Sequence, residues 1–232
     1  MNADYMIYYA LAGVLTMVGM FVSNRLKSTF EKYSRVGLRS GLSGKEAAEK
    51  MLHHYNISDV RIVRGKGYLT DHYNPLTKTI SLSPPVYDGR TISAAAVAAH
   101  ECGHAVQHDQ AYGMLQMRSA LVPFVKVASA AQGYLLMIAL MMVSQMPTLL
   151  LVVIIAFAVT TLFSMLTLPV EFDASKRALN WLEDAGVTTG NEHDGAKDAL
   201  WWAAMTYVSA ALSSLVILVY LVLQYASAGN RR

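Results

Sequence analysis

The stretch from Thr148 to Leu168 reads TLLLVVIIAFAVTTLFSMLTL and contains no charged residue. Crossing the hydrocarbon core of a bilayer takes about 20 apolar residues in a helix. A surface helix of a soluble protein would instead keep a polar face, with charged side chains recurring along it. The stretch therefore predicts a membrane-spanning helix in preference to a buried core helix of a soluble protein.

Three further apolar stretches extend this prediction to four transmembrane segments. They cover residues 5–22, 128–143 and 203–225, and the second has an alternative start near Leu121. The first could also be a signal peptide, which has positive residues before its apolar run and a small-residue cleavage site after it. Here the positive residues follow the run and no A-x-A pattern precedes them, so we expect a retained anchor.

The positive residues next to the first segment predict the orientation of the chain. Cytoplasmic flanks of transmembrane segments carry an excess of lysine and arginine. We therefore place residues 23–127 and 169–202 in the cytoplasm and both termini outside, in a multi-pass protein of the cell membrane. The residues that carry this argument are Arg25, Lys27, Lys32, Arg35 and Arg39, whereas Arg231 and Arg232 argue mildly against it.

The composition of the chain excludes several other classes of protein. The chain has 232 residues, of which 54% are hydrophobic and 15% charged, and this excludes intrinsic disorder and a coiled coil. The single Cys102 excludes an internal disulfide. The formal net charge of +3 comes without a basic stripe interleaved with aromatic residues, so we expect no nucleic-acid partner. Residues 1–232 are predicted to form a single membrane-embedded domain.

The polar region after the first segment predicts a small α+β arrangement. Ser43 and Glu46 form a capping box before an apolar stripe, which predicts a helix over residues 44–55. Stretches 60–64, 68–73 and 79–83 have strand character, with turn residues at 74–77, and a second helix is expected over 91–108. The predicted fold class is mainly α with a small antiparallel β-sheet, in a multi-pass membrane protein.

The sequence His100-Glu101-Cys102-Gly103-His104 matches the pattern H-E-x-x-H. On a helix, residues at i and i+4 project from one face, so His100 and His104 can bind one Zn²⁺. Glu101 lies on the adjacent face, where its carboxylate can act as general base toward water at the metal. The alternative is a pair of surface histidines without a metal.

A catalytic zinc needs a third protein ligand. His108 lies eight residues after His100, which is about 12 Å along a helix, so it is too far to share the ion. Glu171, on a second helix beside an apolar segment, is the favoured ligand, because a carboxylate there is costly without a partner. Asp173 is its rival. The alternative for Glu171 is an ordinary acid favoured by a helix dipole.

These residues resemble the YugP-like neutral zinc metallopeptidases of bacterial membranes. The matching stretches are GLSG (41–44), LTDHYNP (69–75), VYDGR (86–90), VAAHECGHA (97–105), RSALVP (118–123), TLPVEFDAS (167–175) and Leu200 to Ala211. The resemblance implies a gluzincin-type site, with Glu171 as zinc ligand. HtpX-like membrane proteases are more distantly similar, and their zinc glutamate is followed four residues on by aspartate, where this chain has Ser175. Which group orients the histidines therefore stays an open question between Ser175, Asp173 and another residue.

Other polar residues are weaker candidates. His72, Arg177, His193 and Tyr207 are candidates for stabilising an oxyanion, each with a structural alternative. Cys102 is expected to be a small buried hydrophobic residue. The strand over 68–73 is either a substrate-binding sheet edge or a purely structural hairpin.

The leading hypothesis is a membrane-bound zinc metalloendopeptidase that hydrolyses membrane proteins or peptides near the bilayer at a cytoplasmic site. One rival is a site-two type intramembrane protease, which the short polar stretch around His100 disfavours. The other is a catalytically silent, zinc-stabilised adaptor or chaperone partner, which Glu101 disfavours because a structural site needs no base. The sequence leaves the natural substrate, the regulation and the oligomeric state open.

Overall fold

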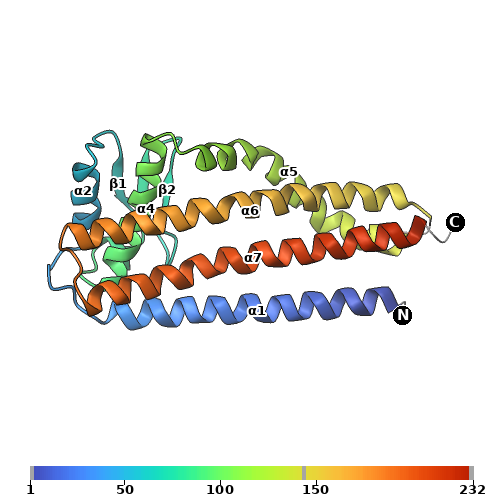
Figure 1. The fold of residues 1–232 in the computed structure, drawn as a ribbon, viewed down its shortest axis with the longest axis horizontal. Coiled ribbons are helices and arrows are strands. Elements are labelled where there is room, and N and C mark those ends of the chain that lie inside the picture. Colours follow the sequence, from blue (N-terminus) through green and yellow to red (C-terminus); the bar gives the residue numbers. More distant parts are fainter. Residues whose placement is uncertain (1–2, 143–144, 230–232) are drawn as a thin grey trace. The chain divides into compact units, whose positions relative to one another are not determined.

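The computed structural model describes residues 3–142 and 145–229. Val143, where the second predicted segment ends, and Arg231 and Arg232 lie outside the described residues. The described chain forms seven helices and three strands: α1 (Ala3–Ser34), α2 (Gly44–His54), β1 (Arg61–Arg64), β2 (His72–Asn74), β3 (Thr79–Leu82), α3 (Pro84–Tyr87), α4 (Ile92–Asp109), α5 (Gly113–Met141), α6 (Pro147–Asp184) and α7 (Asn191–Gly229) (Figure 1). The fold is mainly α with a small sheet, as predicted.

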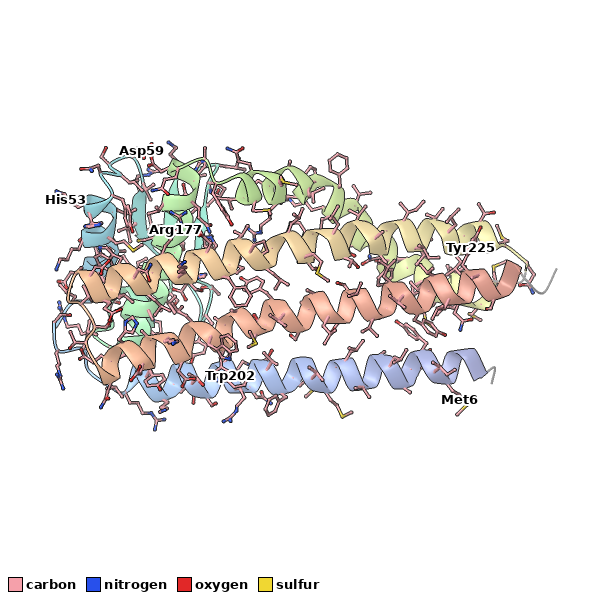
Figure 2. All side chains as sticks on the ribbon, viewed as in Figure 1. Met6, His53, Asp59, Arg177, Trp202 and Tyr225 are labelled. Atoms are coloured by element: carbon pink, nitrogen blue, oxygen red, sulfur yellow. The ribbon has the colours of Figure 1, made fainter. Side chains whose placement is uncertain are left out.

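Four helices are long and apolar enough to cross a membrane. They are Met6–Ser34, Gly113–Met141, Thr148–Asp184 and Asn191–Ser227. The predicted segments 5–22, 148–168 and 203–225 lie inside longer helices that continue into polar sequence, whereas the second, 128–143, begins inside α5 and is predicted to end beyond Met141, the last residue of that helix. Side-chain nitrogen and oxygen atoms gather near His53 and Asp59 and are sparse around Tyr225 and Met6 (Figure 2).

The chain divides into two compact units. The apolar unit comprises Met1–Val22, Met117–Leu168 and Thr206–Arg232, and the polar unit comprises Ser23–Gln116 and Pro169–Met205. Inside the apolar unit, a buried cluster joins α5, α6 and α7 through side chains such as Leu140, Val153 and Leu221. A single membrane-embedded domain with the predicted segment boundaries stays a prediction.

The core of the polar unit forms around α4. The small side chains of Ala95, Ala98 and Ala99 are fully buried, and this allows the neighbouring helices to approach α4 closely. Met51 from α2 and Trp181 from α6 complete the same buried cluster. In Figure 1, α2 and the sheet lie near α4, and α2, β2 and β3 contact it directly.

Capping residues mark the start of two helices, close to where the sequence predicts them. Ser43 Oγ accepts from the amide of Glu46, and the Glu46 carboxylate accepts from the amide of Ser43, which is the predicted capping box at the start of α2. The hydrogen bond from the Ser43 amide, together with Arg90, lowers the pKa of Glu46 to about 2. Thr91 caps α4 through the amide of Ala94.

The predicted antiparallel sheet is wrong in one respect, because the sheet is mixed. β2 pairs antiparallel with β3, but β1 pairs parallel with β3, and the strand order is β1-β3-β2. The chain between β1 and β2 crosses over and leaves β3 in the centre, where Ile80 and Leu82 are fully buried. Strand character alone does not specify which strand takes the central position. The expected strand over 68–73 is also shorter, beginning only at His72.

Asn74 explains the turn between β2 and β3. Its side-chain oxygen accepts hydrogen bonds from the amides of Leu76 and Thr77, which is the turn chemistry expected of asparagine. Asp71 then ties the start of β2 to the end of β3, because its carboxylate accepts from both the amide and the hydroxyl of Ser83. The strand order leaves β2 at one edge of the sheet, where it also contacts α4.

Candidate metal centre

The two histidines of the motif project from one face of α4. The His100 ring lies edge-on to the His104 ring, with their centroids 4.8 Å apart. They lie on the buried face of α4, and His104 is only 9% exposed. The helical spacing therefore brings two imidazole rings together, as the sequence predicts.

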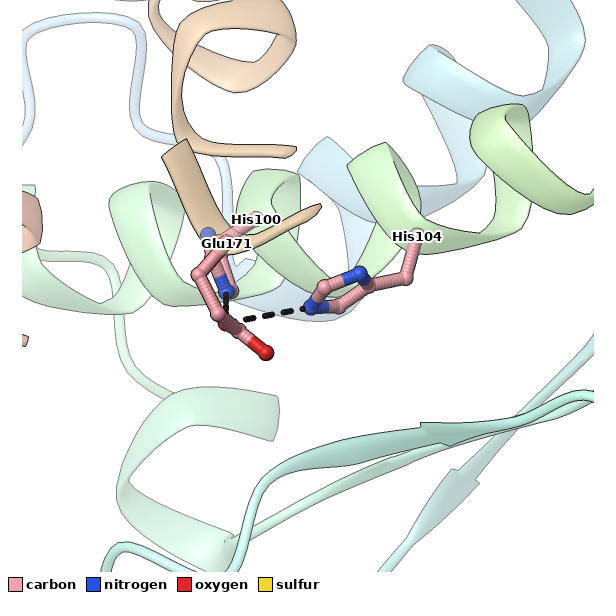
Figure 3. A group of neighbouring side chains, drawn as sticks. All are labelled: His100, His104 and Glu171. Atoms are coloured by element: carbon pink, nitrogen blue, oxygen red, sulfur yellow. Dashed lines mark ion pairs between the residues drawn. The ribbon is translucent and has the colours of Figure 1, made fainter. Parts of the chain in front are cut away.

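Glu171 reaches these rings from α6. Its Oε2 lies 3.3 Å from His100 Nε2 and 3.5 Å from His104 Nε2. One ligand atom from each of the three residues lies within 4.8 Å of the other two (Figure 3). Glu171 is 2% exposed, and the cost of burying a carboxylate is offset by its two imidazole neighbours. The three residues that the sequence nominates as ligands are thus brought together.

The spacing of these donors fits zinc. Two ligand atoms that each lie about 2.0–2.1 Å from a tetrahedral Zn²⁺ are about 3.3 Å apart. The distances from Glu171 Oε2 to the two Nε2 atoms, 3.3 and 3.5 Å, agree with that separation. Two histidines and one glutamate are also a donor set that holds catalytic zinc. The donor types and both distances to Glu171 Oε2 therefore fit the ion, and all three ligand atoms lie within 4.8 Å of one another.

A glycine permits the close approach of α4 to α6. A Cβ atom on Gly103 would lie 2.6 Å from the backbone oxygen of Ala174 and 3.1 Å from its Cα. Because both neighbours are backbone atoms of a helix, they cannot move independently of Glu171, which lies one turn earlier in α6. Gly103 thus sets the distance between the histidines and the carboxylate.

Ser175 contacts Nδ1 of His100, the ring nitrogen that does not face Glu171. Its Oγ lies 3.1 Å from His100 Nδ1, while His100 Nε2 faces Glu171. A partner on Nδ1 fixes the ring orientation and leaves Nε2 to act as the metal ligand. This contact answers, for His100, the question that the sequence left open between Ser175 and Asp173.

Gln107 holds His104 in the same way. Its Oε1 lies 3.0 Å from His104 Nδ1, and its Nε2 donates to the backbone oxygen of Val170 and to Asp173, each at 2.8 Å. Both partners of Nε2 only accept, which fixes the amide so that Oε1 faces the imidazole. Because Oε1 can only accept, Nδ1 of His104 carries a proton, and in the neutral imidazole this leaves the lone pair on Nε2, where a metal could bind.

Asp173 belongs to this supporting network. Its carboxylate accepts from Gln107 Nε2 and from Arg177 Nε, the latter at 2.5 Å, and Arg177 also donates to Gln110 Oε1. Asp173 is not among the three grouped donors, so it does not compete with Glu171 in this arrangement. Its carboxylate instead orients Gln107.

Burial and the neighbouring charges act in opposite directions on the pKa of His104. Burial lowers the pKa of the imidazole, but hydrogen bonding to Glu171 and the charges of Glu171 and Glu101 outweigh burial and raise the pKa above its ordinary value. The effect of Glu101 shows that its carboxylate lies within electrostatic reach of the site, and Glu101 is itself only 8% exposed. A cation is therefore favoured at this position.

Cys102 is a buried hydrophobic residue, as expected. It is fully buried, its thiol contacts the backbone oxygen of Ala48, and burial raises its pKa well above the ordinary value. His108, the rejected third ligand, lies outside the cluster and has its Nδ1 at 2.7 Å from the hydroxyl of Tyr73. Neither residue contributes a ligand to the grouped donors.

The candidates for an oxyanion partner have other contacts. His72 Nδ1 lies 2.9 Å from the backbone oxygen of Thr70, which fits a bracing role in the turn. His193 lies 3.4 Å from the hydroxyl of Thr188 and 3.8 Å from a carboxylate oxygen of Glu183. Arg177 is engaged by Asp173 and Gln110 as above, and Tyr207 belongs to the apolar unit. An oxyanion role for any of them stays a prediction.

Sequence reasoning missed the role of Gln107. In the sequence this residue is one polar position among others in the helix expected over 91–108. The available signal was its position three residues after His104, one helical turn away on a neighbouring face. Its partners on α6 are more than sixty residues distant in the chain, so only the packing of α4 against α6 shows what it does.

Comparison with known proteins supports this picture. Residues 8–226 match the family described as "Putative neutral zinc metallopeptidase". The chain is also 42% identical over 199 residues to the "Putative membrane protease YugP" of Bacillus subtilis (strain 168), which covers 86% of this chain and 88% of that protein. No solved structure matches the chain.

Replacing Gly103 with alanine should disrupt the metal centre. The added methyl group would force α4 and α6 apart, so we expect a stability loss of about 1–3 kcal/mol and substoichiometric zinc in the purified protein. Metal content and the thermal midpoint in detergent measure the two effects. Gly133→Ala is the matched control, because a Cβ atom there meets nothing within 4 Å. Full zinc content in Gly103→Ala would contradict the role given to this contact.

Replacing Gln107 with leucine should weaken zinc binding while preserving volume. Loss of an outer partner of a ligating histidine lowers metal affinity by about 10–100-fold. Competition with a fluorescent chelator measures the change, and Gln116→Leu, at an exposed position on α5, is the control. An unaltered zinc affinity would show that His104 needs no partner on Nδ1.

Proposed function

Since the chain belongs to the neutral zinc metallopeptidase family, we propose that it is a membrane-bound zinc metalloendopeptidase that cleaves membrane proteins or peptides close to the bilayer. Zinc is the proposed cofactor, His100, His104 and Glu171 are the proposed ligands, and Glu101 is the proposed general base. The observation that carries the proposal is the pair of 3.3 and 3.5 Å separations between Glu171 Oε2 and the two Nε2 atoms.

Each protein group has a distinct task in this proposal. A zinc ion with three protein ligands supplies a Lewis acid that polarises the scissile carbonyl and lowers the pKa of water toward about 7. Glu101 accepts the proton of the attacking water and passes it to the departing amine. Ser175 and Gln107 contact Nδ1 of His100 and His104, which would leave both Nε2 atoms to hold the ion.

The surroundings of the site support the proposed substrate class. The ligands lie on helices of a chain that has four potential membrane spans, and the Bacillus relative is named a membrane protease. β2 is an edge strand in contact with α4, which carries the motif, so we propose that it binds an extended substrate segment as an added strand. Such binding uses backbone hydrogen bonds and tolerates varied side chains.

We also propose that the site faces the cytoplasm. The support is the excess of basic residues that follows the first apolar run within α1, where Arg25 and Lys27 come directly after it. The same rule places residues 23–127 and 169–202, which include all three proposed ligands, on one side.

Glu101→Gln separates catalysis from metal binding. We expect peptidase activity to fall by at least about 100-fold, because the proton acceptor is lost, while zinc content stays near that of the parent protein. Peptide cleavage assays with and without chelator, together with metal analysis, measure both. Glu49→Gln, an exposed acid on α2, is the control, and Glu171→Ala should lose zinc.

The outcomes distinguish the proposed peptidase from a silent adaptor. Full activity in Glu101→Gln would remove it as the base. A parent protein that retains one zinc and cleaves no membrane-protein peptide would favour the zinc-stabilised adaptor.

Cysteine labelling in intact cells tests the orientation. We expect Lys50→Cys on α2 to react with a membrane-impermeant maleimide only after permeabilisation, and Gln145→Cys to react at once, because the two lie on opposite sides of the predicted second segment. The native Cys102 is fully buried and should give little background. Immediate labelling of Lys50→Cys would reverse the proposed orientation.

A further inference from the structure

A cavity of about 310 Å³ lies between α6 and α7 within the polar unit. Phe172 and Leu179 line it from α6, and Trp201 lines it from α7. Trp201 is 54% exposed and Phe172 is 39% exposed, so both aromatic side chains of the lining are open to contact with an apolar group. The volume is in the range of sites that bind small molecules.

Cations line the other part of the cavity. Lys176 projects from α6 and Lys197 from α7, with His193 nearby. In the described part of the chain neither ammonium group forms an ion pair or a hydrogen bond, and none of the lining residues is acidic. The cavity therefore offers two uncompensated positive charges, which an anionic ligand would satisfy.

The aromatic residues and the lysines of the lining follow the same order along both helices, although Leu179 lies beyond Lys176 on α6. On α6, Phe172 is closest to the apolar run that ends at Leu168, and Lys176 is one turn farther. On α7, Trp201 and Ala204 lie at the start of the apolar run, and Lys197 is about one turn before Trp201. At a rise of 1.5 Å per residue, the lysines lie about 9–12 Å beyond the apolar runs. That order matches an amphiphile with its charged end away from the membrane core.

We propose that this cavity binds an anionic phospholipid. The phosphate lies between Lys176 and Lys197, and the start of an acyl chain covers Phe172 and Trp201. Basic pockets between transmembrane helices on the cytoplasmic side bind anionic headgroups in this manner. A free phosphate would satisfy the lysines but would leave the aromatic side chains uncovered, so the combined lining favours the lipid.

The cavity adjoins the metal centre through one residue. Ser175 lines the cavity and also contacts His100 Nδ1, the ring nitrogen that does not face Glu171. A bound lipid would thus lie beside the partner of a proposed zinc ligand without entering the space that the three donors face. The lipid site does not depend on the proposed peptidase activity, and its test requires no substrate.

Tryptophan quenching tests the proposal on the full-length protein in detergent. In a Trp202→Phe background, Trp201 is the exposed reporter, since Trp181 is 2% exposed. We expect phosphatidylglycerol with brominated acyl chains to quench the fluorescence at lower concentration than brominated phosphatidylcholine. Lys176→Gln combined with Lys197→Gln should weaken the response to phosphatidylglycerol roughly 30-fold, as expected for the loss of two basic residues. Additional replacement of Trp201 with phenylalanine should remove the lipid-specific signal.

The controls separate this site from general effects of charge. Lys50→Gln combined with Lys66→Gln removes two lysines outside the cavity and should leave the response unchanged, and replacing both cavity lysines with arginine should preserve it. Inorganic phosphate at millimolar concentration should compete weakly. Equal quenching by the two lipids, an unaltered response in the double glutamine variant, or complete displacement by phosphate would each overturn the proposal.

Discussion

The close contact of α4 with α6 is the constraint on which the candidate site depends. At Gly103 the absence of a side chain lets the backbone of Ala174 approach, and this places the Glu171 carboxylate 3.3 and 3.5 Å from two imidazole nitrogens. The alanine-rich face of α4 also permits close approach of neighbouring helices along its length, because small side chains allow helices to pack closely. The metal centre is thus a consequence of helix packing as much as of ligand chemistry.

Burial makes the supporting hydrogen bonds important. A buried imidazole has two tautomers, and only the one with a free Nε2 can bind a metal from this face. Ser175 and Gln107 contact the Nδ1 atoms of His100 and His104, and Asp173 and Val170 in turn hold the Gln107 amide. The same helix, α6, therefore supplies the carboxylate, one direct orienting contact and the partners of the other. A rigid helix can carry all three because residues three and four apart lie on one face.

The continuation of α6 and α7 beyond their apolar runs links membrane association to the site. Each helix changes from apolar to charged sequence within a few residues, so the polar unit begins where the membrane-spanning prediction ends. The cavity lined by Lys176, Lys197 and Trp201 lies in that region of changing polarity, and Ser175 joins its lining to the supporting contacts of His100. The proposed lipid site and the candidate metal centre are therefore connected through Ser175.

Sequence by itself determined the features that depend on local periodicity and composition. The uncharged run from Thr148 to Leu168 identified a helix able to cross a membrane, the Ser43–Glu46 capping box began α2, and the i, i+4 spacing placed His100 and His104 on one face. Glu171 was nominated because an acid at the end of an apolar run needs a partner. Each of these inferences uses neighbours within a few residues along the chain.

Only the tertiary structure decided what depends on contacts between distant segments. The parallel pairing of β1 with β3 follows from which strand occupies the buried centre, and strand propensity is the same in either arrangement. Gln107 and Asp173 likewise have no local pattern that distinguishes an orienting residue from an ordinary polar one, because their partners are on different helices. Local sequence fixes which face a side chain occupies, whereas the packing of that face against another element fixes what the side chain does.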